Sequence, residues 1–219
     1  MTVSTADRRR TDPGTLAWLA GPCLLLAGLL ILVSQFAVWP LRSSPIITSL
    51  SSPVYFPAMV VYLVSMWVLI VGLFALHQRQ ARESRTFGLV ALVAAVFGTA
   101  NMAGNIWFDT FVAPWLARQI PAALEVPRDG TLVIGALFSY VSMTLGWMLV
   151  GAACFRAGVI PRPLAACLIP AGVLAFFPLP PYSIVFGAVV LAVGVWLSRH
   201  PRQAYAPAVT VRERDSSNR

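Results

Sequence analysis

The chain has 219 residues, of which 58% are hydrophobic and 11% are charged, and its formal net charge is +8. A soluble domain carries about 25% charged residues, so this composition excludes an ordinary water-soluble protein. Most of the positive charge lies in short segments beside apolar runs, which indicates orientation in a membrane and not binding to nucleic acid.

Six apolar runs follow one another along the chain. Backbone groups in hydrocarbon must be hydrogen-bonded within their own segment, so each run is predicted to be a helix. The first run is too long for a signal-peptide core and has no convincing cleavage site, so we expect an uncleaved span. The predicted spans are Leu16–Trp39, Tyr55–Leu76, Phe87–Phe108, Thr131–Phe155, Leu164–Phe177 and Tyr182–Leu197.

The fifth run is short, contains Pro170 and is joined to the sixth by the prolyl segment 178–181. This connection is short and rigid, which predicts a tight helical hairpin. A re-entrant segment is the alternative for the fifth run, but the distribution of arginines favours a full span.

Thirteen of the 16 arginines fall on one side of this topology, and only Arg42, Arg118 and Arg128 fall on the other. The positive-inside rule therefore places both termini in the cytoplasm. We predict an all-α, polytopic transmembrane bundle of six spans in the bacterial cell membrane. Residues 1–14 are its cytoplasmic N-terminal segment, 15–198 its transmembrane domain and 199–219 a disordered cytoplasmic tail.

The sequence offers no pattern for a metal or cofactor. Cys23, Cys154 and Cys167 lack CxxC or CxxH spacing, and His77 and His200 lie at helix ends. There is also no phosphate-binding loop, dinucleotide fingerprint or GxSxG nucleophile. We therefore expect neither a metal nor a cofactor.

Polar side chains within the spans gather in the half of the predicted bundle opposite the cytoplasm. On the third span, Gly98, Asn101, Asn105 and Asp109 are spaced three, four and four residues apart, so they share one helix face. A similar stripe runs from Gly135 to Gly146 on the fourth span. Interhelical hydrogen bonds with close packing are one interpretation of these stripes, and a substrate pocket is the other.

Asp109 is the only acidic residue at or within a predicted span. One interpretation makes it the cap of a short interfacial helix over residues 111–120. The other makes it a desolvated acid that donates a proton. Trp67 and Trp147 lie deeper than the other tryptophans, where they either pack in the core or line a pocket.

Four stretches, Phe87–Val90, Asp109–Pro114, Gly146–Gly151 and Gly158–Arg162, resemble a broad group of small actinobacterial integral membrane proteins. In size, number of spans and aromatic content, the chain is also similar to the small membrane-bound terpene cyclases of meroterpenoid pathways. This second resemblance implies cyclisation of a prenylated substrate, started by protonation of an alkene or an epoxide.

Such a reaction needs one acid, an apolar cavity and aromatic faces that stabilise carbocations, without metal, nucleotide or nucleophile. We expect Asp109 to be the acid and Asn105 and Asn101 to orient it. The expected substrate-binding residues are Tyr62, Trp67, Tyr140, Trp147 and Gln35. The predicted partners are membrane lipid and a small hydrophobic or prenylated substrate.

The alternative function is non-catalytic: a permease for a small hydrophobic compound, or an accessory subunit. A pocket open sideways to lipid, with Asp109 facing it, favours the enzyme. A continuous polar path favours the permease, and a solid bundle in which Asp109 caps a helix favours the accessory subunit.

Overall fold

The computed structural model describes residues 16–126, 130–177 and 179–200, and within these ranges the chain forms helices and no strands. The predicted all-α bundle is therefore confirmed. The predicted N-terminal segment 1–14 and the predicted tail, apart from its first two residues, lie outside the described residues. The helices are α1 (Ala20–Val38), α2 (Ile46–Leu50), α3 (Tyr55–Trp107), α4 (Ala113–Gln119), α5 (Ala122–Glu125), α6 (Gly130–Ala157), α7 (Arg162–Leu174) and α8 (Tyr182–Arg199).

Shorter helical segments extend two of these helices. The 3-10 turns η1 (Ala17–Leu19) and η2 (Trp39–Ser43) flank α1, and the π-helical turn η3 (Phe108–Val112) joins α3 to α4. With these extensions, five segments of the described part of the chain are long and apolar enough to cross a membrane: Ala17–Ser43, Tyr55–Ala81, Glu83–Gln119, Gly130–Ala157 and Tyr182–Arg199. They correspond to five of the six predicted spans.

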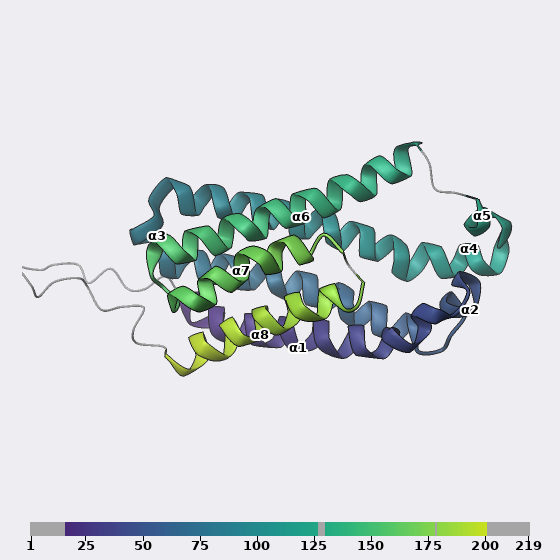
Figure 1. The fold of residues 1–219 in the computed structure, drawn as a ribbon, viewed down its shortest axis with the longest axis horizontal. Coiled ribbons are helices and arrows are strands. Elements are labelled where there is room, and N and C mark those ends of the chain that lie inside the picture. Colours follow the sequence, from purple (N-terminus) through teal and green to yellow (C-terminus); the bar gives the residue numbers. More distant parts are fainter. Residues whose placement is uncertain (1–15, 127–129, 178, 201–219) are drawn as a thin grey trace, which may run out of the picture.

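The helix α3 consists of two antiparallel halves. The chain reverses near Arg85, whose φ of 41° and ψ of −129° are not helical. The first half ends at about Ala81, and the second runs from Glu83 toward Trp107. This reversal supplies the tight connection between the second and third predicted spans (Figure 1).

The long helices form a closed ring of neighbours. The helix α1 packs between α8 and the first half of α3, the second half of α3 packs on α6, and α7 lies between α6 and α8. Large side chains fill the interior, among them Met66, Leu69, Leu73 and Trp147, each no more than 2% exposed. The predicted hairpin of the fifth and sixth runs is confirmed by the packing of α7 on α8.

Glycines allow the helix backbones to approach one another closely. A Cβ atom added to Gly28 of α1 would lie 2.5 Å from the Leu191 backbone nitrogen of α8. A Cβ atom added to Gly146 of α6 would lie 2.5 Å from Ala95 Cα of α3. Such small-residue contacts are typical of helix pairs that associate in a membrane.

The helix α7 is shorter than its predicted span. It ends at Leu174, whereas the apolar pattern continues to Phe177. Pro178 has no backbone N–H that could bond to the Leu174 carbonyl, and it disfavours helical geometry at the residue directly before it. Its 13 residues span roughly 20 Å, less than the ~30 Å of a bilayer core. The predicted number of six full spans therefore stays a prediction.

One end of the bundle carries Ala17, Arg79, the turn at Arg85, the α6–α7 connection and Arg199; we call it the basic end. Arg79 is 8% exposed, and its Nε donates to the Ala17 carbonyl at 2.7 Å. Its Nη1 donates to the Leu197 carbonyl at 3.4 Å, so one side chain joins three helical segments. We call the opposite end, where α2, α4 and α5 lie, the pocket end (Figure 1).

Candidate substrate pocket

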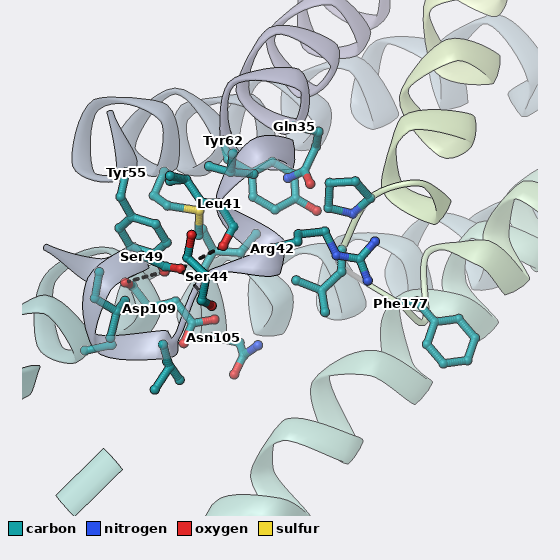
Figure 2. A pocket seen from close by; sticks show the side chains of 18 of the residues that line it. Gln35, Leu41, Arg42, Ser44, Ser49, Tyr55, Tyr62, Asn105, Asp109 and Phe177 are labelled. Atoms are coloured by element: carbon teal, nitrogen blue, oxygen red, sulfur yellow. Dashed lines mark hydrogen bonds between the residues drawn. The ribbon is translucent and has the colours of Figure 1, made fainter. Parts of the chain in front are cut away.

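A cavity of about 690 Å³ lies at the pocket end of the bundle (Figure 2). This volume is within the range of about 300–1,000 Å³ that is usual for small-molecule sites. Its wall is formed by the end of α1, the η2–α2 segment, both ends of α3, α6 and the connection from α7 to α8. The ring of helices therefore surrounds one shared cavity.

The cavity exists because the α7–α8 hairpin is short. The hairpin turns back before it reaches the far ends of α1, α3 and α6, and its turn contributes Phe176, Phe177, Leu179 and Pro180 to the wall. The beginning of α6 consequently projects beyond its neighbours, and nothing lies within 4 Å of a Cβ atom added to Gly135.

The wall between α6 and this turn is only partly closed. Leu137, Phe177 and Leu179 line the cavity and remain 45%, 47% and 55% exposed. The wall on this side is therefore formed by apolar side chains that also reach the surface of the bundle.

Hydrogen bonds between different parts of the chain hold polar side chains around the cavity. Asn105 Nδ2 donates to Tyr140 Oη at 3.3 Å, which links α3 to α6. Tyr55 Oη donates to the backbone carbonyl of Asp109 at 3.3 Å, which links the two ends of α3 (Figure 2). Ser183 Oγ donates to Gln35 Oε1 at 2.8 Å, which links α8 to α1.

Asp109 lies in the π-helical turn η3 and lines the cavity with a half-buried side chain. The predicted short helix after it is present as α4, but the N-cap residue of α4 is Val112 and no side chain caps it. Asp109 therefore sits inside a continuous helical path and does not cap α4. Single π-helical turns within α-helices are frequent at functional sites.

Five of the eight predicted site residues line this one cavity: Gln35, Tyr62, Asn105, Asp109 and Tyr140. They come from three helices and were grouped in the sequence only by their depth along the predicted spans. The structure therefore brings these five residues together around one cavity. Their roles in binding and catalysis stay predictions.

The other three predicted residues lie elsewhere. Asn101 Nδ2 donates to the Phe97 carbonyl of its own helix at 2.9 Å, and Trp67 is 56% exposed on the outside of the bundle. Trp147 is 1% exposed, and its Nε1 donates to Thr99 Oγ1 at 3.1 Å. Of the two interpretations of Trp147, core packing therefore agrees with the structure.

The cavity also contains residues that the sequence did not single out as a site. Arg42 and Asp109 are the two charged residues of its lining, and Ser44, Ser49 and Tyr55 add hydroxyl groups. Arg42 entered the sequence argument only as one of three arginines on the less basic side. No helical periodicity connects the η2–α2 segment to α3, so nothing in the sequence placed Arg42 in the same cavity as Asp109.

The bond between Ser183 and Gln35 gives a test of the cavity wall. Both residues are buried, at 2% and 1% exposure, so S183A leaves the Gln35 amide oxygen without its donor. We expect S183A to lower the free energy of unfolding in detergent micelles by about 1–3 kcal/mol. S142A is the matched control, because Ser142 Oγ bonds only a carbonyl of its own helix, and it should change stability by less than half as much. Equal losses in the two variants would contradict this assignment.

Comparison with known proteins adds no relative to this description: no family model, curated protein or solved structure matches the chain.

Proposed function

We propose that the protein is a membrane-embedded, metal-independent cyclase that acts on a prenylated substrate, with Asp109 as the proton donor. The observation that carries this proposal is the composition of one cavity. It combines a half-buried carboxyl group with aromatic side chains and apolar walls.

In the proposed reaction the Asp109 carboxyl group delivers its proton to a terminal alkene carbon, or to an epoxide oxygen whose C–O bond then breaks. The tertiary carbocation formed is attacked by the π electrons of the next alkene, which closes a carbon–carbon bond. Loss of a proton from the final cation forms a new alkene. The proton lost balances the proton delivered, so the net reaction is an isomerisation that needs no co-reactant.

The aromatic residues fit the second half of this reaction. Tyr55, Tyr62, Tyr140 and Phe176 line the cavity on several sides. Aromatic faces attract cations through the ring quadrupole, most strongly where water is excluded. Asn105 fixes the hydroxyl group of Tyr140, and edge-to-face contact with Phe176, with ring centroids 5.7 Å apart, restrains its ring.

The packing below the cavity supports an enzyme over a permease. Between the cavity and the basic end, Met66, Leu69 and Trp147 are at most 1% exposed, and Trp147 packs edge-on against Phe186 with ring centroids 5.0 Å apart. A permeation path would have to displace this packed core. The partly exposed, apolar wall beside α6 instead suits a substrate that reaches the cavity through the lipid.

The arginine bias supports an orientation for the whole bundle. We place the basic end and both termini in the cytoplasm and the cavity in the outer leaflet of the cell membrane. Substrate and product would then exchange with that leaflet.

The proposal is tested with the full chain purified in detergent and reconstituted into phosphatidylcholine liposomes. The probes are farnesylated phenols with and without a terminal epoxide, and the products are separated by liquid chromatography with mass detection. We expect a product of unchanged mass and altered retention. Its proton NMR spectrum should show one alkene fewer for the probe without an epoxide and loss of the epoxide signals for the probe with one. The absence of any such isomer from either probe would refute cyclisation.

A further inference from the structure

Among the described residues that line the cavity, Arg42 carries the one positive charge. It lies in η2, directly after α1, in a segment that begins with Trp39 and Pro40. Ser49 Oγ donates to the Leu41 carbonyl at 2.8 Å and so holds the segment that carries Arg42 against α2. Among the described residues, the guanidinium of Arg42 has no hydrogen-bond or ion-pair partner.

The two charged residues occupy different sides of the cavity. In Figure 2 the side chain of Arg42 extends toward Phe177, whereas Asp109 lies on the side of Tyr55 and Ser49. An anionic group in the cavity is attracted to the Arg42 position, whereas the Asp109 position offers no positive charge to bind it. The cavity therefore distinguishes the two ends of an elongated molecule that is charged at one end.

We propose that Arg42 binds an anionic group of the substrate, a carboxylate or a phosphate, so that the substrate is an amphipathic prenylated anion. This inference rests on the proposed function for the prenyl part of the molecule and adds its polar end. A guanidinium presents a rigid fork of donors that matches both groups bidentately. With the anion at Arg42, the apolar chain lies along the aromatic wall and its far end approaches Asp109.

The test compares ligands that share a prenyl chain and differ in charge. Dissociation constants of farnesyl monophosphate and farnesol are measured by quenching of tryptophan fluorescence, with the full chain in phosphatidylcholine nanodiscs. We expect the wild type to bind the monophosphate at least about tenfold more tightly, as one charge-assisted pair of hydrogen bonds provides. R42Q should lose that preference and keep its affinity for farnesol, which also shows that the variant is folded.

R118Q is the matched control. Arg118 is an exposed residue in the last turn of α4, at the same end of the bundle but outside the lining of the cavity. The R118Q substitution removes the same charge as R42Q, and this variant should keep the preference for the monophosphate. Equal affinities of the two ligands for the wild type, or an unchanged preference in R42Q, would overturn the inference.

A competition experiment distinguishes a prenylated anion from a lipid headgroup as the group that Arg42 binds. Dioleoylphosphatidic acid is added to the nanodiscs as a competitor. Little competition is expected. Competition as strong as that of farnesyl monophosphate, lost in R42Q, would assign Arg42 to membrane lipid and refute the substrate role. Because binding is measured without turnover, a charge preference without any cyclised product would refute the proposed reaction and leave Arg42 as an anion site.

Discussion

The D109N protein is expected to fold like the wild type and to form cyclised product about 10²- to 10⁴-fold more slowly, the usual contribution of a general acid. Asparagine has nearly the same volume as aspartate but has no acidic proton to deliver to an alkene. The bond from Tyr55 Oη ends on the backbone carbonyl of residue 109, so the substitution leaves it in place. The measurement is the initial rate of product formation in liposomes, beside the midpoint of thermal unfolding.

E83Q is the matched control for D109N. Glu83 is an exposed acidic residue at the opposite, basic end of the bundle, outside the lining of the cavity. Its replacement removes the same charge and should leave the rate within about twofold of the wild type, since no group of the reaction depends on it. A D109N protein that forms product at the wild-type rate would refute the role of Asp109.

A further variant separates chemistry from folding. D109E keeps the carboxyl group and displaces it by one methylene, so it should retain part of the activity that D109N loses. If D109N and D109E unfold at the same lowered temperature and are equally inactive, Asp109 supports the π-helical turn and not the reaction.

The position of polar residues along the predicted spans indicated the end of the bundle at which the cavity lies. It did not identify every residue that lines the cavity. The 3.6-residue period placed Asn105 and Asp109 on one face, and both line the cavity. Trp67 and Trp147 were selected by depth alone, and depth does not indicate which face of a helix is turned toward the cavity. The structure places Trp67 outside the bundle and Trp147 in the packed core.

The η2–α2 part of the site consists of helices of five residues each, which are too short for helical periodicity to place them. The η2–α2 segment folds through local turns and through the bond from Ser49 to Leu41, and no sequence period indicates where such a segment comes to lie. Arg42 was therefore counted only as a charge. The end of α7 was misjudged for a related reason, because the apolar pattern continued through Phe177 while the approaching proline ended the helix.

A substitution in the stripe of small residues on α6 is expected to have a large effect on the stability of the bundle. Gly146 and Gly135 are both helical and both belong to this stripe, so the sequence does not distinguish them. In the structure an added Cβ atom at Gly146 meets only backbone atoms of the second half of α3, whereas one at Gly135 meets nothing within 4 Å. Backbone atoms cannot rotate away as a flexible side chain does, so the two helices must separate.

G146A is therefore expected to lower the free energy of unfolding by about 1–3 kcal/mol or more, the cost of overpacking a close contact. G135A, the same substitution on the same helix, should be neutral or stabilising by up to about 1 kcal/mol, because alanine is the better helix former. Both are measured by denaturation in mixed micelles with increasing dodecyl sulfate. Similar losses in the two variants would contradict the close packing of α3 on α6.

The same pair of variants connects packing to the cavity. Asn105 and Tyr140 face each other across the α3–α6 contact that Gly146 permits, and their bond is already 3.3 Å long. Separation of the two helices by a few tenths of an ångström would break that bond and widen the aromatic wall. We therefore expect G146A, and not G135A, to weaken farnesol binding under conditions in which both variants remain folded. Unchanged binding in a destabilised G146A protein would show that the cavity wall is held from the α1 and α8 side instead.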